Sequence, residues 1–261
     1  MPPSRDRALR VVELLAHASD GLPMSEIAER LAIPKTAIHR LLSDLQHMGY
    51  VSHTHDGRFC LTVKIISVAL DYLAATGLTD AVQPPLDYAA RQSGELVRLA
   101  VVNREQLIWI AKAQGAGPGL RYEPGPGCIV NLAATATGLA WLATLPEDQA
   151  LRLIAEQGLA PEPTQGPHAP RSLQAVLAQL EKVRAQGHAM IFDSNEQGMS
   201  ALAVPVFSPV SRQALGALCI TGPSFRFTQE RMQALLPVAL ETASALGRAS
   251  RESPLLTRTV G

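Results

Sequence analysis

The side chains best suited to chemistry in this sequence lie on one predicted helix that follows Pro34. One side of this helix is basic or small and polar, and its members are Lys35, Thr36, His39, Arg40 and Ser43. Ammonium, guanidinium, imidazole and hydroxyl groups can hydrogen-bond to base edges and phosphates in the major groove of duplex DNA. Arg40 is the strongest candidate for reading a base, because a guanidinium can bridge O6 and N7 of guanine.

The other side of the same helix is apolar at positions i, i+3, i+4, i+7 and i+10, which are Ile38, Leu41, Leu42, Leu45 and Met48. This spacing predicts a helix that packs on neighbouring elements and leaves its polar side free. The alternative interpretation is an ordinary solvated helix face without a partner. The turn before the helix, the proline at its first position and the hairpin that follows it favour DNA.

The elements around this helix complete a recognisable motif. Two predicted helices over residues 4–18 and 25–31 come before it, and Gly49 is its expected left-handed C-terminal cap. The dipeptide Asp56-Gly57, between two alternating segments, predicts a β-hairpin. Three helices followed by a hairpin make a winged helix-turn-helix, which we assign to residues 1–62.

Further basic side chains stand where phosphates could be reached. Arg58 lies beside the predicted hairpin turn, and we expect it to contact a phosphate or the minor groove. Arg5 and Arg7, with Arg10 close by, lie near the N-terminus, and contact with phosphates is favoured over packing for them.

A metal site was considered at the hairpin. His53 and His55 are two residues apart, so they share one face of a strand and could bind a metal together. No third ligand lies nearby in the sequence. We therefore expect no metal and no cofactor.

The charge balance of the chain weakly opposes nucleic-acid binding. The formal net charge is zero, and residues 1–60 contain seven Lys/Arg and seven Asp/Glu. A DNA-binding domain usually carries a basic excess, because neutralising phosphates supplies much of its affinity. We expect modest affinity from each domain, which dimerisation makes useful.

Length and composition favour a cytoplasmic protein of two domains. The chain has 261 residues and is 47% hydrophobic and 18% charged. No apolar run reaches the roughly 18 residues of a membrane span, and the N-terminus lacks the apolar core of a signal peptide. The three cysteines, Cys60, Cys128 and Cys219, are odd in number and widely spaced, which indicates neither a disulfide framework nor a zinc site.

Residues 63–77 form one predicted apolar helix that ends at Gly77. It is too hydrophobic to lie alone in water. Packing against the same helix of a second copy is the simplest explanation. We therefore expect a linker that also serves as a dimerisation helix.

From residue 78 onwards helices and strands mix. Predicted helices cover residues 79–93, 135–144, 146–158, 173–186 and 228–248. Predicted strands cover residues 95–102, 106–112, 187–192, 199–207 and 214–221, with a possible short strand at 120–123. We assign residues 78–253 to a second domain and residues 254–261 to a flexible tail.

Several segments together resemble the IclR family of bacterial transcriptional regulators. The similar segments are Pro34–Leu42, Gly49–Val51, Ala134–Ala143, Gly187–Ala189 and Gly198, Ala203–Val206 and Gly216–Pro223, in the family's order and spacing. The resemblance implies an α+β protein with an N-terminal winged helix-turn-helix, a linker helix and a C-terminal GAF-like antiparallel sheet flanked by helices. It also implies a dimer or tetramer that binds a double-stranded DNA operator and a small-molecule effector, with no membrane partner.

The same resemblance implies where the effector binds. The candidate residues are Ala134, Thr135, Ala136, Thr137 and Gly138 before and at the start of one helix, then Asp193, Ala201, Cys219 and Thr221. Amide groups and the dipole at the start of that helix could hold a carboxylate. The alternative for each of these residues is an ordinary place in the core of the sheet. Trp109 and Trp141 could also line the site, but for them a place in the core is favoured.

Departures from the family pattern bear on the effector. The family often has Cys at the position of Ala201 and Ser at those of Cys219 and Thr221, with His at Ala133 and Lys at Leu139. Each change removes or softens a polar group, which favours a less polar ligand. We expect a small aromatic or weakly polar carboxylate rather than a small hydroxy-acid.

Two rival functions remain. A winged-helix adaptor that binds proteins without DNA affinity would fit the neutral charge. A small-molecule enzyme would need Cys128 or Cys219, His188 and Asp193 as nucleophile, base and orienting group. No nucleophile elbow, phosphate loop or metal-ligand spacing supports catalysis. We therefore expect a regulator and not an enzyme.

Overall fold

The structure, a computed structural model, describes residues 4–123, 129–159, 165–253 and 256. The chain divides into two compact units, residues 1–75 and 76–261, each of which is described by itself. The α+β class expected from the sequence is confirmed, with helices and antiparallel sheets in both units.

The first unit is a helix-turn-helix with a small sheet. Its elements are α1 (Ser4–Ala16), β1 (Leu22–Pro23), α2 (Met24–Leu31), α3 (Lys35–His47), β2 (Val51–His53) and β3 (Arg58–Leu61). The three strands are antiparallel in the order β1-β3-β2. The strand β1 was missed from the sequence, because two residues carry no periodic pattern.

Local geometry explains where α3 begins and ends. Pro34 is the N-cap residue of α3 and has φ −55° and ψ 139°, which is not a helical conformation. The helix therefore begins at Lys35 rather than at Pro34. After the helix Gly49 has φ +78°, and the amide of Tyr50 donates to the carbonyl of Leu45 at 2.9 Å. A left-handed residue of this kind ends a helix at little cost only when it is glycine.

The apolar side of α3 packs into the core of the first unit. Ile38 and Leu42 are fully buried, together with Ile27 of α2 and Val11 of α1. The sequence placed Met48 on the same stripe, and this was wrong. Met48 is 56% exposed, because the helix ends at His47 and the chain turns there.

Two helices follow the small sheet. α4 (Val63–Thr76) ends before Gly77, whose φ is +61°, and α5 (Leu78–Ser93) begins after it. Among the described helices none by itself is long and apolar enough to cross a membrane; α4 and α5 reach that length and composition only as a pair, which is bent where they meet.

The second unit is built on a five-stranded antiparallel sheet. Its strands are β4 (Leu96–Asn103), β5 (Gln106–Gln114), β6 (Ala189–Phe192), β7 (Met199–Phe207) and β8 (Ala214–Pro223), in the order β5-β4-β8-β7-β6. The possible strand over residues 120–123 is absent. A single bridge joins Ile129 to Ile108 instead.

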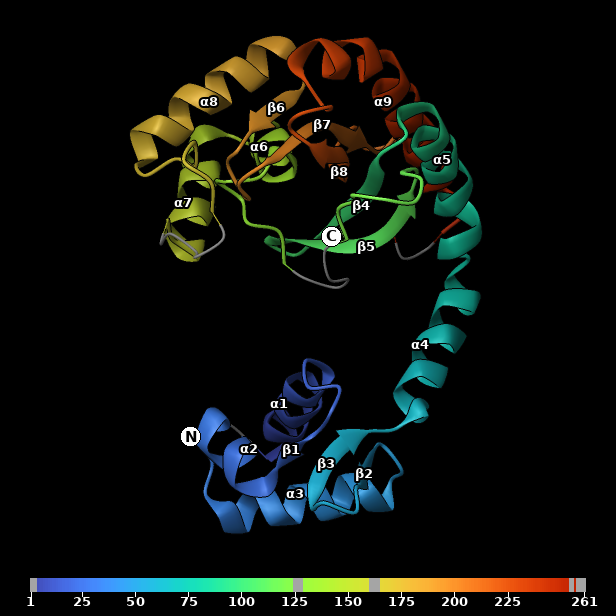
Figure 1. Cartoon of the computed structure of the whole chain (residues 1–261), viewed down its shortest axis with the longest axis vertical. Helices are drawn as coiled ribbons and strands as arrows, with labels where there is room; N and C mark the ends of the chain where they lie inside the picture. The colour runs from blue at the N-terminus through green and yellow to red at the C-terminus, as the bar shows by residue number, and fades with distance from the viewer. Residues whose placement is uncertain (1–3, 124–128, 160–164, 254–255, 257–261) are drawn as a thin grey trace. The chain divides into compact units, whose positions relative to one another are not determined.

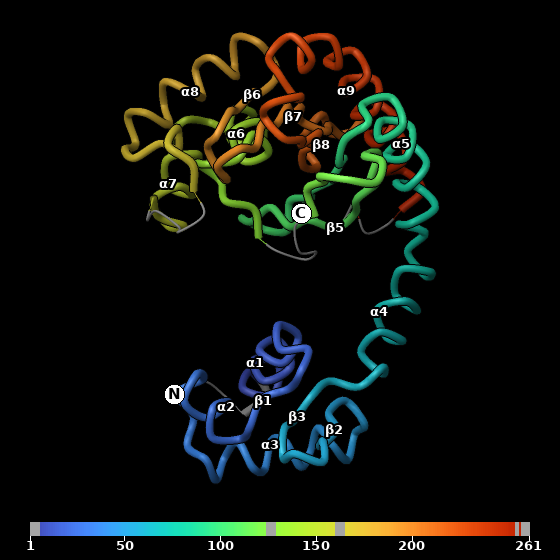
Figure 2. Tube along the Cα trace, in the orientation of Figure 1, coloured from blue at the N-terminus to red at the C-terminus, as the bar shows by residue number. Residues whose placement is uncertain are grey.

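Helices cover both faces of this sheet (Figure 1). α5 and α9 (Gln229–Ala249) lie side by side against one face, as Figure 2 also shows. α6 (Ala136–Leu142) and α8 (Leu173–Gln186) lie on the other side, with α7 (Glu147–Gln157) beyond α6. Strand alternation gives the sheet two apolar faces, as burial from both sides requires.

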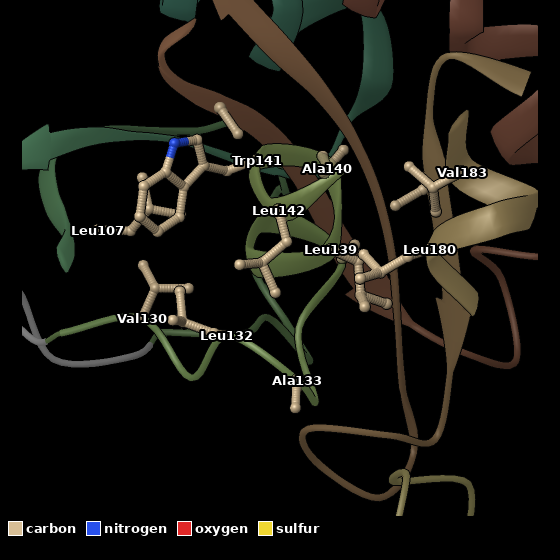
Figure 3. Close-up of a cluster of buried hydrophobic side chains, with 14 of the residues drawn as sticks. Leu107, Val130, Leu132, Ala133, Leu139, Ala140, Trp141, Leu142, Leu180 and Val183 are labelled. Atoms are coloured by element: carbon tan, nitrogen blue, oxygen red, sulfur yellow. The ribbon is translucent and has the colours of Figure 1, made fainter. Parts of the chain in front are cut away.

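The short helix α6 is the centre of the larger core (Figure 3). Leu139 and Leu142 are buried in it, and Leu180 of α8 packs beside Leu139. Gly138 allows this close approach, because a Cβ there would lie 2.2 Å from the carbonyl oxygen of Leu132. Trp141 is buried in this core and only 3% exposed, as expected.

The predicted flexible tail needs one correction. Of residues 254–261 only Leu256 lies in the described part, and it is 2% exposed. Its amide donates to the carbonyl of Ser253, whose side chain is fully buried. Leu256 itself is therefore buried.

Candidate functional sites

The polar side of α3 is open to solvent. All five predicted DNA-contacting side chains of this helix are exposed, namely Lys35, Thr36, His39, Arg40 and Ser43. The buried apolar side of the same helix holds α3 on the first unit. A helix held in this way can enter a major groove with its polar side forward.

The hairpin between β2 and β3 is braced by its own side chains. The amide of Arg58 donates to Thr54 Oγ1 at 3.0 Å, and the Thr54 hydroxyl donates to Asp56 Oδ1 at 2.6 Å. The hydrogen bond from Thr54 lowers the pKa of the Asp56 carboxyl, and the nearby Arg58 adds to the effect. The tip of the hairpin between β2 and β3 therefore carries the Asp56 carboxylate beside Arg58.

Arg58 does more inside the unit than the sequence suggested. We expected its guanidinium at a phosphate or in the minor groove. Its Nε instead donates to the carbonyl of Asp20 at 3.3 Å and lies 3.7 Å from the Asp56 carboxylate. The side chain is half-buried and ties β3 to the turn before β1.

The N-terminal arginines lie on α1. Arg10 is exposed, and Arg7 is half-buried and has an interaction within the chain. Arg5 belongs to the first turn of α1, but its side chain lies outside the described residues.

The metal site considered at His53 and His55 can be compared with the structure. The ring of His53 packs against Phe59, with 4.7 Å between ring centres. Within the described parts of the chain no three His, Cys, Asp or Glu side chains are grouped as a metal site would need.

A cavity lies in the second unit between the start of α6 and the neighbouring strands of the sheet. Part of this cavity is open to solvent. Six of the predicted effector-binding residues line it, namely Thr135, Ala136, Thr137, Ala201, Cys219 and Thr221. The antiparallel register explains this, since Ala201 pairs with Thr221, and Cys219 lies two residues before Thr221 on the same face.

Three predicted effector residues do not line this cavity: Ala134, Gly138 and Asp193. The Ala134 amide donates to Asn131 Oδ1, and the Gly138 amide donates to Thr135 Oγ1, so both amides are bonded within the protein. Asp193 Oδ1 accepts from the Gly198 amide at 2.7 Å and closes the turn between β6 and β7. These three residues do not line the cavity; their hydrogen bonds hold the loop before α6, the first turn of α6 and the turn after β6.

Arg98, which the sequence analysis missed, is a cationic residue that lines this cavity. It lies in the middle of β4, beside Cys219 of β8, and is only 8% exposed. Its guanidinium carbon lies 3.7 Å from the centre of the Trp109 ring. One signal was available: Arg98 is the sole charged residue in a run of apolar ones from Leu96 to Val102.

A second polar group in the cavity was also missed. Tyr122 and Glu196 both line it, together with Asn195 and Ser200. Burial raises the pKa of the Tyr122 phenol, and its hydrogen bond to Glu196 raises it further, so the phenol stays protonated and donates to the carboxylate. The cavity is therefore more polar than the substitutions at Ala201, Cys219 and Thr221 suggested.

Hydroxyl and thiol groups complete the lining. The Thr137 side chain is fully buried beside Cys219. Cys219 Sγ lies 3.1 Å from Thr221 Oγ1, and burial raises the pKa of this thiol. A protonated, buried thiol is a poor nucleophile, which weighs against the catalytic interpretation. Cys128 lies outside the described residues.

Comparison with known proteins covers both units. Residues 4–55 match the family model of the IclR helix-turn-helix domain, and residues 70–248 match that of the bacterial transcriptional regulator IclR C-terminal. The chain is similar to the probable transcriptional regulator SauR of Cupriavidus necator, with 28% identity over 232 residues that cover 88% of this chain and 90% of the relative.

Solved structures share the fold. An IclR transcriptional regulator from Alicyclobacillus acidocaldarius has a TM-score of 0.84 at 25% identity, covering 96% of this chain and 99% of that one. An IclR homologue from Microbacterium hydrocarbonoxydans, crystallised in complex with 4-hydroxybenzoate, has a TM-score of 0.75 at 21% identity, covering 96% and 100%.

Proposed function

The chain belongs to the IclR family of bacterial transcriptional regulators, and from this premise we propose how its residues bind DNA and an effector. It carries the DNA-binding helix-turn-helix of that family, and its relatives are transcriptional regulators rather than enzymes. The proposal concerns the contacts, the partner copy and the ligand.

We propose that α3 enters the major groove of an operator with Arg40 reading a guanine. In this proposal Lys35, Thr36, His39 and Ser43 contact neighbouring bases or phosphates, and Arg5, Arg7 and Arg58 contact phosphates. The observation that carries this assignment is the exposed polar side of α3 above its buried apolar stripe. A guanidinium held rigidly by such a helix can discriminate a guanine by about 1–3 kcal/mol.

Two copies are needed to read an operator with two half-sites. We propose that α4 supplies the contact between them. Its apolar side chains are exposed in the single chain, among them Val63 (80%), Ile66 (56%) and Leu70 (59%). Pairing α4 with its counterpart in a second copy would remove this surface from water.

In the second unit we propose that the cavity binds a small aromatic or weakly polar carboxylate. Arg98 supplies the positive charge for the carboxylate, and Trp109, Ala136 and Ala201 supply apolar contacts. A buried arginine binds a carboxylate through charge-assisted hydrogen bonds. The complex of an IclR homologue of the same fold with 4-hydroxybenzoate supports this ligand class.

Effector binding would then change DNA affinity through the two segments next to the cavity, the loop before α6 and the turn after β6. The Ser194 hydroxyl donates to the Ala134 carbonyl at 2.8 Å, so the loop before α6 and the turn after β6 are already joined. We propose that a ligand repacks this contact and thereby alters how two α4 helices hold their winged units. Coupling between such sites is typically about 1–3 kcal/mol.

Binding to DNA from upstream of the protein's own gene tests the assignment of α3. Fluorescence anisotropy of that DNA should show salt-sensitive binding by the full chain. Arg40→Ala should abolish specific binding, whereas Arg91→Ala, which removes an exposed arginine of α5, should not. Unchanged operator affinity of Arg40→Ala would refute the assignment.

The rival adaptor function gives a different result in the same assay. An adaptor without DNA affinity would show no binding even at low salt, with or without an aromatic carboxylate. That outcome would favour a protein partner for the exposed side of α3.

A further inference from the structure

We infer that Lys64 is a positioning residue for DNA binding, because it fixes the end of α3 to the first turn of α4. The inference rests on the proposed function, since it presumes that α3 reads DNA. Both α3 and Lys64 belong to the first unit, so the contact lies within one compact body. Lys64 acts through α3 and is not itself placed in the groove.

Lys64 holds the chain at the point where α3 ends. Its Nζ donates to the carbonyl of Met48, the C-cap residue of α3, at 2.6 Å. The last carbonyls of a helix lack partners within the helix and carry the negative end of its dipole. An ammonium group at this place forms a charge-assisted hydrogen bond, which is roughly twice as strong as a neutral one.

The same ammonium group lies over an aromatic ring. Lys64 Nζ is 4.7 Å from the centre of the Tyr50 ring, which is within the range of a cation–π contact. Tyr50 is partly buried and packs against the core of the first unit. Two contacts therefore orient the ammonium group toward the end of α3.

Thr62 provides a second link between the same two segments. Its hydroxyl donates to the Gly49 carbonyl at 2.6 Å, and its amide donates to the Tyr50 carbonyl at 3.0 Å. The Thr62 hydroxyl oxygen also accepts from the Lys64 amide at 3.2 Å, as the N-cap residue of a helix does. Three consecutive carbonyls, those of residues 48–50, are therefore bonded to the start of α4.

A small tilt of α3 would change its contacts with DNA. The helix has 13 residues. At 1.5 Å per residue it is roughly 20 Å long, so a tilt of about 5° around its C-terminal end moves its N-terminal end by about 2 Å. Hydrogen bonds to base edges do not survive such a displacement, because they need donor and acceptor within roughly 3.2 Å of each other. The bonds from Lys64 and Thr62 therefore set the direction of α3, and they pass a change in the direction of α4 on to it.

Specific and non-specific DNA binding provide the test. Fluorescence anisotropy of the full chain should compare DNA from upstream of its own gene with unrelated DNA of the same length. Lys64→Met keeps the aliphatic stem but removes the ammonium group, and it should weaken binding to the first DNA by about tenfold, as the loss of one base contact would. Affinity for the unrelated DNA, and its dependence on salt, should stay unchanged, because no phosphate contact is lost.

Three further variants complete the test. Lys64→Arg keeps a cation that can donate to the Met48 carbonyl and stack on Tyr50, so it should retain most of the specific affinity. Lys182→Met removes an exposed lysine of α8 and should change neither kind of binding. Thr62→Val removes the hydroxyl bond to the end of α3 and should weaken specific binding as well, which tests the inference even if Lys64→Met folds poorly. Thermal unfolding shows whether each variant is folded.

The possible failures are distinguishable. Unchanged specific affinity in the folded variants of Lys64 and Thr62 would overturn the inference and leave α3 as the DNA-binding helix. Equal weakening on both DNAs in Lys64→Met, with a salt slope reduced by about 0.9, would make Lys64 a phosphate contact instead of a positioning residue. Absence of DNA binding by the wild-type chain would overturn the proposed function, and the inference with it.

Discussion

The guanidinium of Arg98 stacks on the ring of Trp109, with 3.7 Å between the guanidinium carbon and the ring centre. Both residues line the cavity of the second unit, and Arg98 is 8% exposed. A cation over an indole ring is stabilised by about 2 kcal/mol when both are shielded from water. The stack orients the guanidinium of Arg98 beside the cavity.

Arg98→Met should weaken the binding of aromatic carboxylates by about tenfold to a hundredfold, because the charged hydrogen bonds are lost. The variant should still fold, since methionine keeps most of the volume of the replaced side chain. Titration calorimetry with benzoate measures the first effect and thermal unfolding the second. Arg91→Met is the matched exposed control. Benzoate affinity unaffected by Arg98→Met would contradict the role of this arginine.

Lys35 is expected to contact a phosphate rather than a base. Lys35→Ala should therefore weaken binding to all DNA sequences alike, and the slope of log affinity against log salt should fall by about 0.9. Anisotropy measured over a series of salt concentrations gives the slope. Lys182→Ala, at an exposed lysine of α8, should leave it unchanged. A loss confined to the specific operator would instead make Lys35 a base reader.

Glu95 and Arg226 form a partly buried ion pair that supports the cavity. Arg226 Nε and Nη2 donate to the two carboxylate oxygens at 2.6 and 2.9 Å, and Nη1 donates to the carbonyl of Leu120, in the Tyr122 segment. The Glu95 side chain is 8% exposed, so Arg226→Met leaves a buried charge unpaired and should cost about 3 kcal/mol of unfolding free energy.

Urea unfolding tests this pair against an exposed one. Glu95→Gln combined with Arg226→Met should recover part of the lost stability, because no unpaired charge remains. Arg152→Met breaks the exposed pair with Glu105 and should cost less than about 1 kcal/mol. Equal costs for Arg226→Met and Arg152→Met would show that burial of Glu95 does not matter.

Thiol reactivity should separate the cysteines. Burial raises the pKa of Cys219, so at mildly alkaline pH it remains a thiol and should resist iodoacetamide in the folded chain. Cys60, which is partly exposed, should therefore react before Cys219. Peptide mass mapping will show the extent of labelling at each of the two. Fast labelling of Cys219 in the native protein would contradict its burial.

The dimer proposed through α4 should depend on its exposed apolar side chains. Ile66→Glu combined with Leu70→Glu places two carboxylates in that contact and should yield monomers by sedimentation velocity, because charge burial there is costly. Ser67→Glu adds a charge at an exposed polar position of the same helix and should have a smaller effect. A persistent dimer in the double variant would place the interface elsewhere.

Helical periodicity was enough to predict the DNA-binding helix and its exposed side. Ile38, Leu41, Leu42 and Leu45 are all buried, and the polar residues between them are exposed, because a helix repeats every 3.6 residues whatever lies around it. The strand over residues 199–207 was also predicted at its observed bounds. Alternation and turn residues are local signals, which is why these elements needed no tertiary information.

The sequence alone therefore determined the α+β class, most of the helices and strands, and the family to which the segments point. Only the tertiary structure showed that Arg98 lies against Trp109 and that Glu196 lies near Tyr122. It also showed that Ala134, Gly138 and Asp193 do not line the cavity. Such contacts depend on strand register and on loops that meet across the sheet. Periodicity within one segment carries no information about which distant segment it will face.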